Sequence, residues 1–158
     1  EMTRSLGLSD RRKEDLLLLA QFHDIGNIGI PDNILFKPAP LSLEEIEEMR
    51  QHCEIGYRIA ESAPLLSNIS DCILKHHEWW NGNGYPLGLS HEDIPLECRI
   101  LALVDAFDAM TNNRPHRQAM RPDIAVAEIR KRAGSQFDPE LLPRFIEIIE
   151  RIVLSPND

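Results

Sequence analysis

Histidine and aspartate residues recur at four points along the chain, twice as adjacent pairs, and their side chains are common ligands of divalent metal ions. Residue type and spacing select six candidate ligands: His23, Asp24, His52, His76, His77 and Asp105. Imidazole and carboxylate groups without cysteine suit iron, manganese or zinc. Neighbouring residues on a helix point about 100° apart, so each adjacent pair can serve two neighbouring ions. The pattern predicts a two-metal site suited to phosphoryl displacement, with Asp24 as the bridging carboxylate.

Each histidine taken alone has an ordinary alternative interpretation. A single histidine in a helix is commonly a hydrogen-bonded core residue or a surface residue, and His91 and His116 belong to no pair. Burying several ionisable groups together costs several kcal/mol unless metal ions or partners compensate. The set as a whole therefore favours a metal site over an ordinary core.

Length and composition restrict the classes of protein. The chain has 158 residues, enough for one domain, and its 42% hydrophobic and 27% charged residues are typical of a globular protein. Its formal net charge of −9 argues against binding of long nucleic acid but permits a small anion held by metal ions or arginines. The apolar run 16–20 is far shorter than the roughly 20 residues of a membrane span. We expect a cytoplasmic protein without membrane contact.

Cysteine spacing excludes two further kinds of site. Cys53, Cys72 and Cys98 show no CxxC spacing, so they indicate neither a thiolate zinc site nor a disulfide framework. We expect all three to be reduced, buried residues.

The elements that carry the candidate ligands all read as helices. Residues 14–23 predict a helix that ends near Gly26, a residue suited to the left-handed position after a helix, with the His-Asp pair in the last turn. Ser42 and Glu45 form a capping box that predicts the start of one long helix carrying His52. A further helix after Pro64 directs His76 inward.

The second half of the chain adds a loop and three more helices. Residues 81–89 (NGNGYPLGL) contain glycines and a proline that break regular structure, so they predict a loop. Residues 99–110 predict a helix whose core face is formed by Ile100, Leu103, Val104 and Phe107. Helices over 122–133 and 139–153 complete an all-α helix bundle, since no alternating strand pattern is present.

Five motifs in order resemble those of the HD-GYP phosphodiesterases, a branch of the HD superfamily of metal-dependent phosphohydrolases. They are HDIGNIGIPDNIL from His23, HCEIG from His52, HHEWWNGNGYP from His76, RILALVDAFDAMTNNRPHR from Arg99 and GSQFDP from Gly134. The resemblance covers nearly the whole chain, and the HHE-GYP segment is its most specific part. It implies an all-α HD-domain bundle with a glycine-rich GYP loop near the active site, and hydrolysis of cyclic di-GMP to linear pGpG or GMP.

The resemblance also implies roles for individual residues. It makes the six candidates metal ligands for two or three iron or manganese ions, with zinc as an alternative, and gives His23, Asp24 and Asp105 catalytic roles. The same resemblance assigns the substrate phosphates to Arg114 and Arg117, although both arginines could instead be solvated surface residues.

Three further residues near the expected site carry weaker implications. Gly84 and Tyr85 would shape the pocket, and Tyr85 would offer its ring or hydroxyl group to the dinucleotide; a purely structural tight turn is the alternative. Asp108 would bond to the substrate or to water at the metals, unless it only supports a neighbouring side chain.

The chain departs from the family pattern at three places. Asn27 stands where the family usually has lysine, so a positive charge beside the His-Asp pair is missing and activity should be reduced. His116 replaces a common tyrosine. The family draws one more metal ligand from a helix well upstream of His23, so we interpret residues 1–158 as an HD-GYP catalytic domain truncated at its N-terminal side, with a sensory or receiver domain upstream.

The expected reaction is attack of a metal-bridging hydroxide on a phosphorus of cyclic di-GMP, without a covalent intermediate. One alternative within the enzymes is a related HD phosphohydrolase acting on another nucleotide. A second alternative, from a different class, is a catalytically weak or inactive module that binds cyclic di-GMP as a sensor, with Asn27 in place of lysine. The sequence also allows a homodimer.

Overall fold

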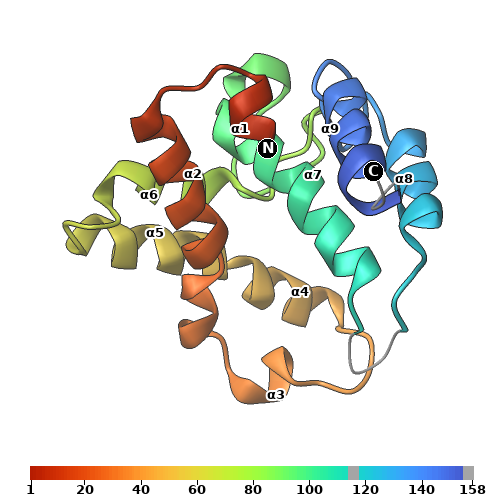
Figure 1. Ribbon diagram of the computed structural model, residues 1–158. Helices are drawn as coiled ribbons and strands as arrows, with labels where there is room; N and C mark the ends of the chain where they lie inside the picture. The colour runs from red at the N-terminus through yellow and green to blue at the C-terminus, as the bar shows by residue number, and fades with distance from the viewer. Residues whose placement is uncertain (114–117, 155–158) are drawn as a thin grey trace.

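A computed structural model describes residues 1–113 and 118–154, and these form an assembly of helices (Figure 1). The α-helices are α1 (Met2–Ser5), α2 (Asp10–Phe22), α3 (Asp32–Leu35), α4 (Leu43–Arg50), α5 (His52–Ser62), α6 (Ser70–Lys75), α7 (Leu96–Thr111), α8 (Pro122–Lys131) and α9 (Leu142–Ile149). Short 3₁₀ turns η1 (Ile25–Gly29), η2 (Ser67–Ile69) and η3 (His91–Asp93) and a π-helical turn η4 (Glu150–Leu154) join or extend them. The described ranges contain only two isolated β-bridges and no strand, which confirms the all-α prediction.

Helix α2 ends earlier than its sequence pattern indicated. Its start is capped by Ser9, whose hydroxyl group accepts the backbone N–H of Arg12 at 3.4 Å. The helix ends at Phe22, so His23 is its C-terminal cap and Asp24 precedes η1. The prediction for Gly26 was wrong, because Gly26 lies inside η1 without a positive φ. Its lack of a side chain instead allows η1 to approach α5.

The capping box at Ser42 and Glu45 is confirmed, but the single long helix that it was expected to start is two helices. The interruption lies at Gln51, whose N–H bonds to the carbonyl of Glu48 at 3.1 Å in a tightened last turn. His52 is therefore the first residue of α5. This break separates α4, which has no buried residue, from α5, which buries a full face that includes His52 and Cys53.

Helix α7 runs through the middle of the fold and contributes to two apolar clusters (Figure 1). Ile100 and Leu103 pack with α1, α8 and α9, whereas Leu101 packs with α2, α5 and α6. The prediction that Val104 belongs to the core face was wrong, since Val104 is 42% exposed and Leu101 only 4%. A helix placed between two clusters buries a wider arc than one stripe of residues covers.

The segments around the GYP loop are held by the chain that follows α8. The backbone N–H of Trp80 donates to the carbonyl of Gln136, and that of Asn81 to Ser135, at 3.2 and 2.9 Å. Residues 139–141 form a turn, so the last helix begins at Leu142, three residues later than predicted. The cause is Asp138, whose carboxylate accepts the N–H groups of the turn and pairs with Arg99 at 2.8 Å.

Two remaining expectations concern cysteines and membranes. Cys53 and Cys98 are buried and Cys72 is half-buried, and all three are free thiols, as the sequence indicated except for the degree of burial of Cys72. Among the described residues, no helix has the length and apolar character needed to cross a bilayer.

Candidate metal centre

Four of the six predicted ligands meet at one point of the fold. Asp24, His52, His76 and His77 each offer one ligand atom, and these four atoms all lie within 4.8 Å of one another. They come from three places in the chain: the junction of α2 with η1, the first residue of α5, and the two residues after α6. Since 28 or fewer residues separate successive contributors, short connections suffice to bring them together.

Asp24 occupies the centre of this group. One carboxylate oxygen, Oδ1, lies 3.7 Å from Nε2 of His52 and 3.8 Å from Nε2 of His76. The other oxygen, Oδ2, lies 3.4 Å from Nε2 of His23. The two oxygens thus face different imidazoles, which is the arrangement that a bridging carboxylate requires.

The imidazoles are oriented by their own backbone. Nδ1 of His52 lies 2.7 Å from the carbonyl oxygen of Met49, and Nδ1 of His76 lies 2.6 Å from that of Ile73. A carbonyl oxygen can only accept, so in both rings Nδ1 carries the hydrogen, and Nε2 is the ring atom that can bind a metal ion when the ring is neutral. His23 repeats the pattern with Ala20 at 3.1 Å. These bonds direct three Nε2 atoms toward Asp24, as metal-ligating histidines require.

The protonation states of the group also suit a cation. Burial lowers the pKa of His52 below its usual value, and burial together with the nearby His76 lowers the pKa of His77 to about 2. A polar contact with the His76 imidazole and the charge of neighbouring histidines lower the pKa of Asp24 to about 2. The lowered pKa values of His52 and His77 favour their neutral, metal-binding form, and that of Asp24 favours its charged form, so these three groups can bind a divalent ion without first releasing protons.

His23 and Asp105 lie beside this group and not within it. Together with His76 and His77 they line a cavity of about 150 Å³ that adjoins the four ligands. The His23 and His76 rings lie 5.3 Å apart in an edge-on arrangement. Both residues can therefore reach the same small space, although their ligand atoms are not gathered as tightly as the other four.

Tyr85 and Gly84 form one wall of the site. The Tyr85 ring stacks on His77, with ring centroids 4.8 Å apart and planes at 28°, and the Arg50 guanidinium lies 4.8 Å from the Tyr85 centroid. Burial raises the pKa of the Tyr85 phenol. A Cβ at Gly84 would lie 2.3 Å from the backbone nitrogen of Trp79, so this glycine permits close approach of the loop. The peptide bond between Tyr85 and Pro86 is cis.

Glu78 is a residue of the site whose role the sequence did not reveal. Its side chain is 3% exposed and accepts three backbone N–H groups of the GYP loop, from Leu87 at 2.6 Å, Gly88 at 3.1 Å and Leu89 at 3.0 Å. Glu78 also lines the cavity beside the ligands. The sequence did contain a signal of this role. Glu78 directly precedes two tryptophans and an irregular loop, and the backbone N–H groups of such a loop need acceptors from outside a helix or sheet.

The other predicted residues lie farther from the ligand group or outside the described ranges. Asp108 is exposed on α7, and its carboxylate accepts the side-chain amide of Asn112 at 2.8 Å. The backbone N–H of Asn27 donates to the carbonyl of Asp24 at 2.9 Å, so Asn27 lies one short turn from the central carboxylate. Arg114 and Arg117 lie outside the described residues.

Comparison with known proteins shows the family of the chain. The HD domain family matches residues 1–141. A cyclic di-GMP phosphodiesterase of Thermotoga maritima is 39% identical over 153 residues, which cover 96% of this chain and 42% of the relative. The cyclic di-GMP phosphodiesterase response regulator RpfG of Xanthomonas campestris pv. campestris is 40% identical over 140 residues, covering 87% of this chain and 37% of that protein.

A solved structure shows the same fold. The cyclic GMP-AMP specific phosphodiesterase V-cGAP3 of V. cholerae superimposes with a TM-score of 0.74 at 23% identity, over 98% of this chain and 42% of that one. The chain therefore belongs to the HD domain family, and its sequence relatives place it in the HD-GYP branch. It spans less than half the length of these relatives.

Proposed function

We propose that this domain is a metal-dependent phosphodiesterase that hydrolyses cyclic di-GMP to linear pGpG or GMP. The observation that carries the proposal is the convergence of one carboxylate and three imidazoles within 4.8 Å. Relatives named as cyclic di-GMP phosphodiesterases support the choice of substrate, and others are named as specific for 3'3'-cGAMP. Both dinucleotides contain at least one guanosine unit.

The donor set suits two or three divalent ions, iron or manganese first and zinc as the alternative. Asp24, His52, His76 and His77 would hold them, and His23 and Asp105 would complete the set from the adjoining cavity. When bound, such ions polarise phosphoryl oxygens and lower the pKa of water toward neutrality. The backbone contacts of Nδ1 would hold the imidazoles of His52 and His76 in one orientation during turnover.

The chain's other residues would position the substrate. We assign the phosphates to Arg114 and Arg117, whose planar guanidinium groups can donate two parallel hydrogen bonds. Tyr85 presents a ring edge and a neutral hydroxyl group beside His77, which suits contact with a ribose or base. Asp108, one helical turn from Asp105 on α7, would support a polar group at the rim of the site.

The test is metal content measured together with hydrolysis. Anaerobically purified protein should contain at least two metal equivalents and convert cyclic di-GMP to pGpG or GMP. His76→Ala should lose both properties, whereas His91→Asn should keep them, because His91 contacts Trp80 and not the ligand group. Metal-loaded protein that leaves cyclic di-GMP intact, or a His76→Ala variant with full activity, would reject the proposal.

A second candidate function is a sensor that binds cyclic di-GMP and returns it unchanged. The observation that favours it is Asn27, a neutral amide bonded through its backbone to Asp24, where a cation would aid charge stabilisation. Tight binding without turnover by metal-loaded protein would select the sensor. An upstream sensory or receiver domain, a cytoplasmic location and a homodimer remain predictions.

A further inference from the structure

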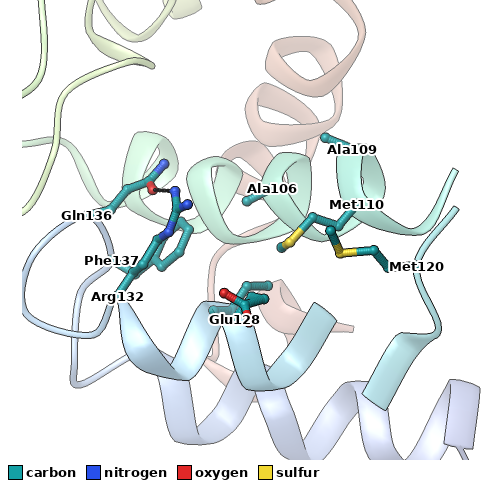
Figure 2. Close-up of a pocket in the computed structure, with 9 residues that line it drawn as sticks. Ala106, Ala109, Met110, Met120, Glu128, Arg132, Gln136 and Phe137 are labelled. Atoms are coloured by element: carbon teal, nitrogen blue, oxygen red, sulfur yellow. Dashed lines mark hydrogen bonds between the residues drawn. The ribbon is translucent and has the colours of Figure 1, made fainter. Parts of the chain in front are cut away.

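A second cavity lies between α7 and α8 (Figure 2). It has a volume of about 290 Å³, and its lining includes Met110, Met120, Glu128, Arg132, Gln136 and Phe137. Ala106 and Gln136 also line the cavity that contains His23 and Asp105. The two cavities therefore share a wall, so the second one adjoins the space in which a ligand of the metal centre would lie.

The apolar part of the second cavity suits a flat ring. Met110 and Met120 lie together because the N–H of Met120 donates to the carbonyl of Met110 at 2.8 Å, which brings the segment before α8 against the end of α7. In Figure 2 the two thioethers lie on one side of the Glu128 carboxylate, and Phe137 and Arg132 lie on the other. Thioether sulfur is polarisable and packs favourably against aromatic rings.

The polar part of the cavity contains one carboxylate. Oε1 of Glu128 accepts from Nζ of Lys131 at 2.6 Å, and this contact lowers the pKa of Glu128. Among the described residues Oε2 has no hydrogen-bond partner, and the side chain is 37% exposed. Arg132 is occupied by a bond to the Gln136 side chain at 2.9 Å. The cavity thus presents an ionised, acceptor-only group beside apolar walls.

We propose that this cavity is a nucleobase subsite that selects guanine through Glu128. The inference rests on the proposed function, because it takes a cyclic dinucleotide at the metal centre as the ligand. Guanine carries adjacent N1–H and N2–H donors on one edge, and a carboxylate can accept both in a fork. Adenine presents N1 as an acceptor at the same place, so its lone pair would face the negative oxygen. The ion pair with Lys131 holds the carboxylate in its charged form.

Glu128→Gln tests the selectivity for guanine over adenine, because it changes the hydrogen-bonding groups of the side chain with almost no change of its shape. The amide offers one acceptor and one donor, so it no longer matches the paired N1–H and N2–H donors of guanine, whereas it can match N1 and N6–H₂ of adenine. One good bidentate contact gives about 1–3 kcal/mol of discrimination, or roughly fivefold to 150-fold in affinity. The metal-loaded protein should bind GMP at least about fivefold more tightly than AMP, and Glu128→Gln should remove or reverse this preference.

Calorimetric titration of the metal-loaded chain with GMP and AMP makes the measurement, since neither mononucleotide is a phosphodiester substrate. Asp123→Asn is the matched control: it converts a carboxylate to an amide on the same helix, at an exposed side chain paired with Arg121. It should keep the parent's preference, and metal content should be equal in all three proteins. Equal affinity of the parent for GMP and AMP, or an unchanged preference in Glu128→Gln, would overturn the subsite.

Hydrolysis of cyclic di-GMP is followed separately. A parent protein that prefers GMP through Glu128 but does not hydrolyse the dinucleotide would refute the proposed function and leave the subsite standing. A protein that hydrolyses cyclic di-GMP, but whose base preference does not depend on Glu128, would support the proposed function and refute the subsite.

Discussion

Gly26 lies so close to His52 that a Cβ on the glycine would be 1.9 Å from the carbonyl oxygen of His52. The same Cβ would lie 2.6 Å from the backbone nitrogen of Gly56, so η1 packs directly on the α5 backbone. This contact sets the distance between Asp24, which precedes η1, and His52, which begins α5. The glycine thereby sets the relative positions of two candidate metal ligands from different elements.

Gly26→Ala should therefore damage stability and the metal site together. Backbone atoms cannot rotate away as a side chain can, so we expect a loss of about 3 kcal/mol or more, at the upper end of overpacking effects. Urea unfolding measures the loss and elemental analysis measures the metal. Gly29→Ala is the control, because its Cβ would meet only the flexible Ile55 side chain, at 2.9 Å. Equal stability of both variants would show that η1 can move freely.

Asp24→Ala should remove most bound metal and all hydrolysis. The central carboxylate faces His23 through one oxygen and His52 and His76 through the other, so its loss deprives each ion of charge and of a ligand. The measurements are metal content and product formation, with the exposed Asp32→Asn, on α3, as control. Two metals per chain in Asp24→Ala would contradict the bridging role.

Glu78→Gln should loosen the GYP loop and leave the fold intact. A glutamine oxygen can accept some of the three loop N–H groups, but its NH₂ group would face donors, and an unpaired buried group costs about 1–3 kcal/mol. Amide hydrogen exchange at residues 87–89 should accelerate, and hydrolysis should fall as Tyr85 loses its fixed place. Glu92→Gln, in the short turn η3, is the matched substitution at an exposed glutamate. Unchanged exchange at 87–89 would assign Glu78 no part in holding the loop.

Substitution of Arg114 and Arg117 by alanine should weaken cyclic di-GMP binding without changing metal content, because guanidinium groups would contact only the substrate phosphates. Arg121→Ala removes an exposed arginine that pairs with Asp123 and should leave affinity unchanged. Affinity equal to the parent in both single variants would make these arginines ordinary surface residues.

The sequence pattern selected four residues whose side chains meet in the fold, Asp24, His52, His76 and His77, because paired His and Asp residues and inward helix positions can be recognised from spacing. Their binding of metal ions stays a prediction. The pattern did not predict the break at Gln51, since one extra tight turn leaves the helical periodicity almost unchanged. Val104 was misplaced because a 3.6-residue pattern does not reveal that α7 touches two clusters. Glu78 escaped notice because its partners are backbone N–H groups, which have no identity in a sequence.

The neutral side chain at residue 27 gives the sharpest distinction between a slow enzyme and a sensor. Asn27 is half-buried and is bonded through its backbone to Asp24, so a cation here would act on charge that develops at the metal centre. A lysine in a partly desolvated site can contribute on the order of 2 to 4 kcal/mol to such stabilisation. In the full-length protein, Asn27→Lys should raise the rate constant by roughly tenfold or more at unchanged metal stoichiometry.

Single-turnover assays at equal metal loading measure the change, and Asn68→Lys, at an exposed residue that contacts Arg11, controls for added charge alone. An Asn27→Lys variant no faster than the parent would mean that the amide substitutes adequately for lysine, and the sensor alternative would lose its main support.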